Sequence, residues 1–398
     1  MSLWTRFKTL PMAHPARSAS RASATGNPFP EVSVLYSSSR PGRLRRAPLL
    51  YAIAAALFGL AACGQETPVT TIRFDAFGGQ VDLSLVGVDR HQAQQAASLV
   101  QQDFAFLQDA WHSWQPGPMG RVNQLLVTEE PFVAPPSTMP LVRLSKELES
   151  QSGGLFNPSI GYLMDLWGFH ANAVRSRPPP PEQQIKRLVA AAPSMSQIDI
   201  EGLELHGHNP AIKLDFDNIA KSHALDLAVE HLRELGIKSA LVQAGGEVRV
   251  IGDRSGQPWR ITIRRPSGSG VLAIVPMRGD ESLVTKADYD RNFVFKGEIY
   301  HAIIDPRTGS PAHGTRSVTV LHRDATTAAA AATAMFVAGP NEWEAVAHAM
   351  NIDYVLLVDS EGTLHMNEAM ADRIDLVDSA APVAPRMQST AAPEATDL

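Results

Sequence analysis

Four features of the sequence carry residue types that could handle a phosphate group or a proton: Lys221, the pair Gly245-Gly246, Asp305 and Thr333. A lysine can bind phosphate as a point charge, although a lysine in the first turns of a helix is more often a solvated surface charge. Gly245-Gly246 lacks the Cβ atoms that would block a phosphate, and it would suit a tight turn equally well. Asp305 either takes part in a site or sets the turn that Thr308-Gly309 completes. Thr333 lies among alanines, where a hydroxyl commonly bonds back to the preceding helical turn.

The single cysteine of the chain, Cys63, follows a segment with the layout of a secretory signal. A basic stretch at 43–46 precedes an apolar run, Leu49 to Leu60, that is short for a membrane span. Cys63 then ends the run Leu60-Ala61-Ala62-Cys63, which resembles the lipobox of bacterial lipoproteins. We therefore expect lipidation of Cys63, which would anchor the mature chain to a membrane and leave the folded part in water. The alternative is a buried, inert cysteine at the end of an ordinary signal peptide.

Composition divides the chain into four parts. Residues 1–42 are rich in Ser, Pro, Arg and Ala without apolar periodicity, which indicates a disordered leader or a mis-assigned start. The signal peptide with its lipobox covers 43–63, one domain covers 64–378, and 379–398 has the composition of a disordered tail. The formal net charge of −6 and the isoelectric point near 6.1 provide no basic face, so we expect no nucleic-acid partner.

The domain shows the alternating strand and helix patterns that are typical of an α+β fold. Helical spacing of apolar residues predicts helices at 91–111, 141–151, from Glu182, and at 220–235, 325–337 and 341–350. Period-two alternation predicts a strand pair within 72–88 that turns at Gly78-Gly79, and strands at 197–205, 211–216, 239–243, 247–251, 259–264, 271–277, 281–285, 300–304 and 354–358. His206 and His208 are expected in the hairpin turn between 197–205 and 211–216, where we do not expect metal binding.

Short motifs follow one another along the domain in an order that is more specific than any one motif. They are Leu155-Phe156-Asn157-Pro158 with Leu166-Trp167-Gly168-Phe169, Leu214-Asp215 with Ile219-Ala220-Lys221, Ala244-Gly245-Gly246, and Asp305-Pro306-Arg307-Thr308-Gly309. From about Phe77 to Arg373 the chain thereby resembles the ApbE family of FAD:protein FMN transferases. The resemblance implies an ApbE-like α+β fold of mixed, mostly antiparallel sheets packed with helices.

The resemblance also implies a reaction: transfer of the FMN half of FAD to a threonine or serine hydroxyl of a target flavoprotein, with AMP leaving. FAD would be a substrate, Mg²⁺ would spread the charge that develops on phosphate, and a base would help the hydroxyl lose its proton. Family members are often lipoproteins, so we expect a lipid-anchored protein on the periplasmic side of a bacterial membrane, with a periplasmic or membrane flavoprotein as target. Matched by motif, the site residues are Lys221, Asp305 and His301 for catalysis, Gly79, Asn157, Asp215, Lys221, Gly245, Gly246, Asp288 and Tyr289 for the flavin cofactor, and Ala220 and Thr333 for the metal.

Several positions depart from the pattern of the family, and they fall where ligands would be held. The family has an aspartate four residues before the metal-binding threonine, whereas Ala329 stands four residues before Thr333. The family has a histidine immediately before Ile-Ile-Asp-Pro, whereas this chain has Ala302 there. His301 lies one place too early, which in a strand points a side chain to the opposite face unless a bulge rotates it. Further differences are Gln80, Asn157, Asp217, Ser222, Gln243, Lys286 and Ala287.

Two functional hypotheses therefore stay open. The first is a membrane-tethered FAD:protein FMN transferase that uses Mg²⁺ in a reshaped site. The second is a catalytically degenerate flavin-binding or scaffold lipoprotein of the same fold, suggested by the departures from the family pattern. Under both hypotheses, Trp167 and Phe169 are expected in the core rather than stacked on a flavin.

Overall fold

The structure is a computed structural model that describes residues 67–170, 174–377 and 381–384. The chain divides into two compact units, Met1–Leu57 and Phe58–Leu398, and every described residue belongs to the second. The expected leader, the expected signal peptide with Cys63, and most of the expected tail lie outside the described residues. Among the helices that are described, none combines the length and the apolar character that a membrane crossing would need.

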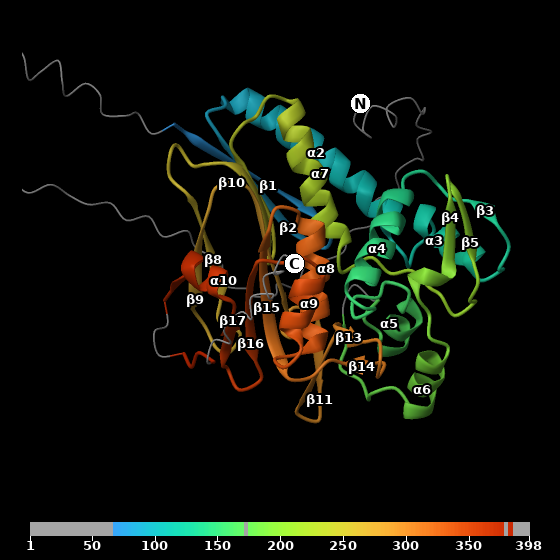
Figure 1. Cartoon of the computed structure of the whole chain (residues 1–398). Helices are drawn as coiled ribbons and strands as arrows, with labels where there is room; N and C mark the ends of the chain where they lie inside the picture. The colour runs from blue at the N-terminus through green and yellow to red at the C-terminus, as the bar shows by residue number, and fades with distance from the viewer. Residues whose placement is uncertain (1–66, 171–173, 378–380, 385–398) are drawn as a thin grey trace, which may run out of the picture. The chain divides into compact units, whose positions relative to one another are not determined.

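An eight-stranded sheet is the largest sheet of the second unit, and all its neighbouring strands are antiparallel (Figure 1). In spatial order its strands are β1 (Val69–Ala76), β2 (Gly79–Val86), β6 (Ala240–Ala244), β7 (Glu247–Gly252), β10 (Gly279–Ala287), β15 (Thr315–His322), β16 (Tyr354–Asp359) and β17 (Leu364–Met366). Smaller sheets are formed by β3 (Phe132–Val133), β4 (Ile198–Glu201) and β5 (Glu204–Gly207), by β8 (Trp259–Arg264), β9 (Val271–Met277) and β18 (Asp375–Leu376), by β11 (Asn292–Phe295) with β12 (Glu298–His301), and by β13 (Ile304–Asp305) with β14 (Ser310–Pro311).

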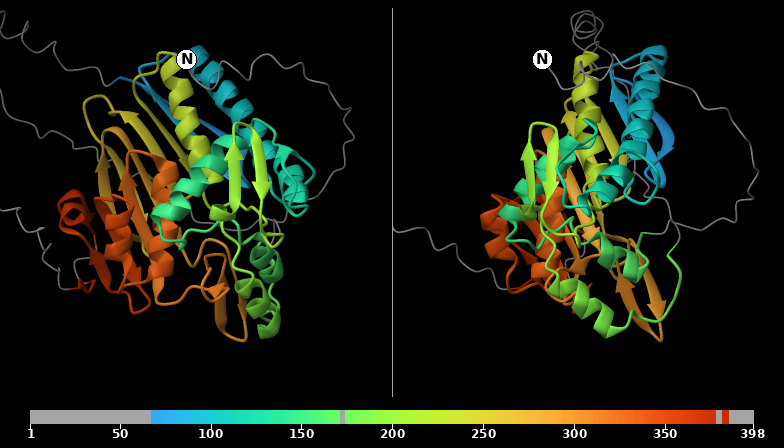
Figure 2. Two further views of the ribbon diagram at one scale, coloured as in Figure 1. Left: turned by 45° about the vertical axis from the view of Figure 1, so that its right-hand side comes forward. Right: turned by 90° about the vertical axis from the view of Figure 1, so that its right-hand side faces the viewer.

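The helices of the described residues complete an α+β fold, as the sequence predicts. They are α2 (Arg90–Trp111), α3 (Pro118–Leu126), α4 (Met139–Gln151), α5 (Gly161–Trp167), α6 (Glu182–Ala190), α7 (Ala220–Glu234), α8 (Ala325–Ala338), α9 (Trp343–Ala349) and α10 (Glu368–Arg373), with a 3₁₀ turn at Met195–Gln197. The two views of Figure 2 show α2 and α7 lying along the eight-stranded sheet.

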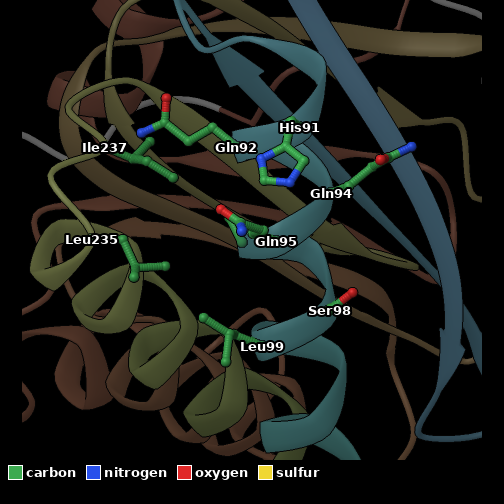
Figure 3. Close-up of a pocket in the computed structure, with 9 residues that line it drawn as sticks. His91, Gln92, Gln94, Gln95, Ser98, Leu99, Leu235 and Ile237 are labelled. Atoms are coloured by element: carbon green, nitrogen blue, oxygen red, sulfur yellow. The ribbon is translucent and has the colours of Figure 1, made fainter.

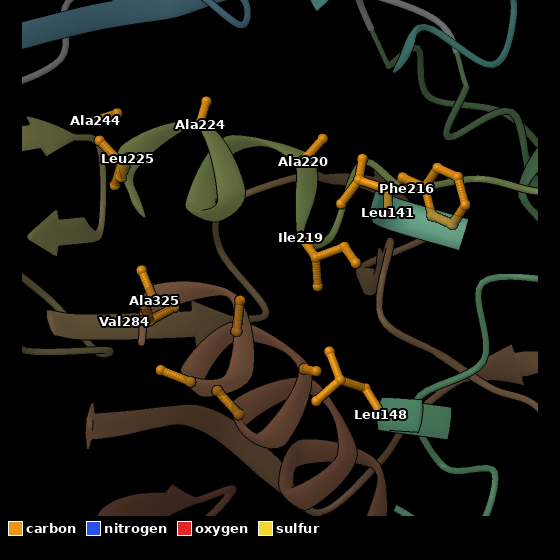
Figure 4. Packing of buried hydrophobic residues seen from close by; sticks show 14 of the residues in the cluster. Leu141, Leu148, Phe216, Ile219, Ala220, Ala224, Leu225, Ala244, Val284 and Ala325 are labelled. Carbon is orange, nitrogen blue, oxygen red and sulfur yellow. The ribbon is translucent and has the colours of Figure 1, made fainter. Parts of the chain in front are cut away.

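Neighbouring residues of the central strands pack into two separate hydrophobic clusters. On β10, Val284 packs with the helices α2, α7 and α8, whereas Leu283 packs with β8 and β9. On β16, Leu357 belongs to the first of these clusters and Leu356 to the second. Because successive side chains of a strand point to opposite faces, this alternation buries both faces of the sheet. Figure 4 shows part of the first cluster, where side chains of α4, α7, β6, β10 and α8 meet.

Helix α8 is rich in alanine and is buried along almost its whole length. Alanine is the strongest helix former, and its short side chain lets the helix lie close to β10 and β15. Two carboxylates satisfy the N–H groups at the start of α8. Asp324 accepts from the backbone N of Thr327 at 2.6 Å, and Asp226 of α7 accepts from those of Ala325 and Thr326 at 2.9 Å. The contacts of Asp226 thereby position α8 against α7.

Most of the predicted elements are present, but the predicted hairpin of 197–205 with 211–216 is wrong. The first segment alone contains the hairpin, since β4 and β5 pair across a turn at Gly202, whose φ is 59°. Residues 211–216 form no strand and make a single bridge, from Lys213 to Ile160. His206 therefore lies in β5 and His208 directly after it, not in a turn.

Three further differences concern β12–β13, β15 and the end of the chain. The predicted strand at 300–304 is interrupted, so that His301 ends β12 and Ile304 begins β13. The central strand β15 was not predicted, and neither were the helices α3 and α5. Residues 381–384 were expected in the tail, yet Leu364 donates to the carbonyl of Pro382 at 2.8 Å and accepts from the N–H of Ala384 at 2.9 Å.

Candidate functional site

The turns that were predicted to bind FAD lie at one end of the eight-stranded sheet. Val81 pairs with Ala244, which places the start of β2 at Gly79 beside the β6–β7 turn at Gly245-Gly246. Val284 pairs with Glu247, so the last residues of β10 lie at the same end of the sheet. Asp288 and Tyr289, both predicted to bind the flavin, directly follow β10. The register of the sheet thus brings Gly79, Gly245, Gly246, Asp288 and Tyr289 to the same end.

The β6–β7 turn has backbone reasons for its two glycines. Gly245 has a φ of 63°, a left-handed conformation that side chains disfavour. A Cβ on Gly246 would come within 3.3 Å of the carbonyl oxygen of Thr285. A Cβ on Gly245 would lie 3.7 Å from Nζ of Lys221, so this lysine lies beside the turn. The turn and the lysine could therefore contact the same anionic group.

Four side chains beside this turn form a group that we call the sheet-end charge cluster: Lys221 and Ser222 of α7, Glu247 of β7 and Lys286 of β10. Glu247 Oε1 lies 2.8 Å from Nζ of Lys286 and 3.5 Å from Nζ of Lys221. Ser222 donates to the other carboxylate oxygen at 2.6 Å. Burial by itself would raise the pKa of Glu247, but the two ammonium groups lower it to about 2. Glu247 is therefore an ionised, almost fully buried carboxylate.

A narrow pocket of about 20 Å³ adjoins this cluster. Its lining includes Asn157 and Asp215, predicted to bind the flavin, and Thr333, predicted to bind the metal, together with Ala302. Asn218 also lines the pocket, and its carbonyl accepts a hydrogen bond from Lys286 Nζ at 2.7 Å. The structure thus brings together residues from four separate motifs and connects them to the charge cluster.

Asp215 is the one carboxylate among the residues that line the pocket. Its two oxygens accept from the indole N–H of Trp114 at 3.1 Å and from the backbone N–H of Asp217 at 2.9 Å. Burial, followed by repulsion from the carboxylate of Asp217, raises the pKa of Asp215 to about 7. A carboxyl group with this pKa can take up or release a proton near neutral pH.

Two further polar side chains of the pocket, Asn157 and Thr333, are held by nearby backbone. Asn157 donates to the carbonyl of Pro193 at 2.8 Å and accepts from the N–H of Ser159 at 2.8 Å. The hydroxyl of Thr333 donates to the carbonyl of Ala329 at 2.9 Å, which is the back-bonding role foreseen for it.

The residues that were expected to hold Mg²⁺ do not fit that ion. Mg²⁺ requires a near-octahedral set of oxygen ligands, usually with one or two carboxylates. Ala329 is fully buried and has no ligand atom in its side chain, so the hydroxyl oxygen of Thr333 is the one side-chain ligand left at this pair of positions. Ala220 begins α7 and can offer only its backbone carbonyl. The expected metal ligands therefore include no carboxylate.

The two other residues predicted to be catalytic, His301 and Asp305, do not line the pocket. One ring nitrogen of His301 donates to the carbonyl of Ala312 at 2.9 Å, and the other accepts from the N–H of Ile303 at 3.3 Å. Burial lowers the pKa of His301 to about 4, so its ring is neutral at physiological pH. Ala302, one residue further on and outside both β12 and β13, lines the pocket instead.

Asp305 sets the turn that follows it, which was one of its two predicted roles. Its side chain accepts from the backbone N–H of Arg307 at 2.8 Å and from the guanidinium of the same residue. Its carbonyl accepts from the N–H of Gly309 at 2.7 Å. The Asp305 carboxylate raises the pKa of Arg307.

Asp288 and Tyr289 lie against arginines at the edge of the sheet end. A carboxylate oxygen of Asp288 is 3.7 Å from the Arg316 guanidinium, and burial raises the pKa of Asp288. The guanidinium of Arg264 lies 4.5 Å from the ring centre of Tyr289, a cation–π contact. Trp167 and Phe169 are buried in a third cluster, as predicted for core residues.

Sequence reasoning missed Glu247, Asn218 and Trp114, which hold the site together. A signal existed for Glu247, because it is a charged residue that directly follows Gly245-Gly246 and begins an apolar strand. A larger depression of about 580 Å³ lies elsewhere, between α2 and the segment after α7 (Figure 3). It is lined by polar side chains such as Gln92 and Gln95 and by apolar ones such as Leu99, and by none of the predicted site residues.

Comparison with known proteins agrees with this geometry. The profile of the ApbE family matches residues 77–356. An FAD:protein FMN transferase from Rhodobacter capsulatus is 35% identical over 319 residues, which are 79% of this chain and 60% of that protein, so the match spans less than two thirds of that relative. One from Vibrio cholerae is 34% identical over 247 residues, which are 61% of this chain and 73% of the relative.

Solved structures give the same result. The crystal structure of the ApbE protein from Thermotoga maritima has a TM-score of 0.70 at 26% identity, covering 77% of this chain and 99% of that one. The flavin transferase ApbE from Vibrio cholerae has a TM-score of 0.66 at 26% identity, covering 77% and 100%. Fold, motif order and sequence similarity all lead to one conclusion: the chain belongs to the ApbE family.

Proposed function

We propose that this protein transfers the FMN half of FAD to a threonine or serine hydroxyl of a target flavoprotein and releases AMP. The similarity to FAD:protein FMN transferases supports this reaction. The observation that carries the proposal is the meeting of Asn157, Asp215 and Thr333 in one pocket that adjoins a lysine-containing cluster. These residues come from three distant parts of the sequence, so only the tertiary fold brings them together.

In this proposal the pyrophosphate of FAD binds beside Lys221 and the Gly245-Gly246 turn. The charge cluster holds two lysines and one ionised glutamate, and both lysines also interact with the buried carboxyl of Asp290. Lys286 is almost fully buried, whereas the side chain of Lys221 is 30% exposed and can reach a ligand. The left-handed turn leaves its backbone open to an anion.

The second step of the proposal is proton transfer from the target hydroxyl. Asp215 is suited to accept that proton because its pKa of about 7 lies near the working pH. We assign no step to Mg²⁺, since the predicted metal ligands include no carboxylate. We also propose that Cys63 is lipidated and that the protein acts on the periplasmic side of a bacterial membrane, which rests on the basic and apolar segments before Cys63 alone.

A specific observation favours a second candidate, a catalytically degenerate flavin-binding or scaffold lipoprotein. The Thr333 hydroxyl is engaged by Ala329, and Lys286 is engaged by both Glu247 and Asn218. Lys286, a departure from the family pattern, thus forms internal structural contacts, and Ala329 removes a carboxylate beside Thr333.

The test is to incubate the full-length chain with FAD and a threonine-bearing flavoprotein target, with and without Mg²⁺, and to follow the mass of the target. The expected result is a mass gain of one FMN, slowed at least about tenfold by Lys221→Met, because the phosphate loses a charge-assisted partner. The matched control is Lys186→Met, since Lys186 is an exposed lysine on α6 that pairs with Glu182 one helical turn away.

No transfer, in an assay that works for a related transferase, would reject the first candidate. A melting temperature raised by FAD would then support flavin binding, and an unchanged one would support a scaffold.

A further inference from the structure

Three side chains of types that commonly bind transition metals share one face of the β4–β5 hairpin. Asp199 of β4 pairs directly with His206 of β5, and His208 follows two residues later. The N–H of His208 donates to the carbonyl of Gln197 at 2.9 Å, so the pairing of the two chains continues to this residue. Directly opposed residues and residues two apart in a strand point to the same face. The three side chains can offer ligand atoms that all lie within 4.8 Å of one another.

We propose that Asp199, His206 and His208 bind a divalent transition-metal ion, with Zn²⁺ as the ion that fits best. Two imidazoles and one carboxylate suit Zn²⁺ and do not suit Mg²⁺, which prefers oxygen ligands alone. Three protein ligands leave the fourth position of a tetrahedral zinc ion to water or to a ligand from outside. This site lies on the three-stranded sheet of β3, β4 and β5, seen at the right of Figure 1, and is independent of the proposed function.

The surroundings of His206 already resemble those of a metal ligand. Its Nε2 lies 3.0 Å from the carbonyl oxygen of Glu129. A carbonyl only accepts, so Nε2 must carry the proton, and Nδ1 is left with the lone pair that binds a metal. Metal-bound histidines almost always donate their second N–H to such a partner. Glu129 presents this carbonyl from a left-handed conformation, with φ at 56°.

His208 and Asp199 are accessible from solvent and already in contact with each other. Their side chains are 46% and 69% exposed, and Nε2 of His208 lies 2.6 Å from Oδ2 of Asp199. The rings of His206 and His208 are centred 4.1 Å apart. Ligands around a tetrahedral zinc lie roughly 3.3 Å from one another, so binding requires only a small opening of the His208–Asp199 contact. The competing interpretation is a simple surface ion pair that binds nothing.

The experiment titrates Zn²⁺ into the metal-free, full-length chain, purified without a histidine tag, and measures heat and stoichiometry. We expect one Zn²⁺ per chain and at least a tenfold weaker affinity after the double change His206→Asn with His208→Asn. Co²⁺ should give the visible absorption of a tetrahedral site in the wild type and lose it in the double variant.

The matched control is His365→Asn. His365 also pairs with an aspartate, Asp359, at 2.8 Å, but it has no second histidine on its strand. This variant should bind Zn²⁺ like the wild type. Should the double variant fold poorly, the exposed Asp199→Asn serves in its place, and the rise of melting temperature with Zn²⁺ is compared. Absence of stoichiometric binding, or binding that neither variant weakens, would overturn the proposal.

Discussion

The pocket and the sheet-end charge cluster adjoin through Asn218, yet their polar groups are satisfied differently. In the pocket, Thr333 bonds to the carbonyl four residues earlier, whereas Asn157 and Asp215 each accept from an N–H two residues later and also bond to a distant partner, Pro193 and Trp114. In the charge cluster, the ionised Glu247 of β7 is held by α7 and β10 together. The donors in the pocket are neutral, whereas the cluster is a buried group of opposite charges that exists only when three elements are assembled. Damage to the cluster should therefore cost more stability than damage to the polar groups of the pocket.

The largest effect on the free energy of unfolding is expected from Lys286→Met. The change leaves buried Glu247 without its nearest cation, 2.8 Å away, and removing one partner of a buried pair costs about 3–5 kcal/mol. Urea unfolding measures the loss, with Lys186→Met as the exposed control. Replacing Glu247 by Met as well should restore much of the stability. A loss below about 1 kcal/mol would mean that Lys221 alone neutralises Glu247.

Asp215→Asn tests how the pocket carboxyl affects the pH dependence of stability. This carboxyl is buried, and its pKa is raised to about 7. Between the unfolded pKa near 3.9 and this value the folded state holds more protons, so the free energy of unfolding of the wild type falls as pH rises. One pKa unit corresponds to about 1.4 kcal/mol. The free energy of unfolding of the variant, relative to that of the wild type, should therefore rise by about 2–4 kcal/mol from pH 4 to pH 7.5. Parallel curves in urea unfolding at several pH values would show that Asp215 is not titrating there.

Gly245→Ala should lower the free energy of unfolding by an intermediate amount, and the loss should come from backbone strain alone. The left-handed φ of 63° costs an alanine about 1–2 kcal/mol, while the added Cβ meets Lys221 Nζ at an ordinary 3.7 Å. Gly79→Ala is the control, because Gly79 has no left-handed φ and nothing lies within 4 Å of its Cβ position. Thermal unfolding should separate the two variants, and equal losses would argue against strain at the turn.

The smallest effect is expected from Thr333→Val, which removes one hydrogen bond within α8 and keeps the shape of the side chain. The loss should be about 1 kcal/mol or less, because the Ala329 carbonyl also belongs to the helix. The same variant tests whether Thr333 binds Mg²⁺. A melting temperature that Mg²⁺ raises in the wild type but not in Thr333→Val would make this hydroxyl a ligand after all.

Where the pattern of the sequence is regular, prediction and structure agree. Helix α2 spans Arg90–Trp111 against a predicted 91–111, and β6 and β7 turn at Gly245-Gly246 as expected. The hairpin at 198–207 was misplaced because the alternation of Ile198, Ile200, Leu203 and Leu205 slips by one residue, and that slip is the turn at Gly202. The missed strand β15 carries the β-branched run Val318-Thr319-Val320, so its signal was present.

The sequence by itself determined the family and the α+β class, because motif order and periodicity are properties of neighbouring residues. It also identified Ala329 and Ala302 as departures from the family pattern. Only the tertiary structure decided that His301 is bonded to backbone through both nitrogens, that Glu247 joins two lysines, and that two histidines face an aspartate. Such contacts depend on strand register and on the approach of distant elements, and no local pattern encodes either of these.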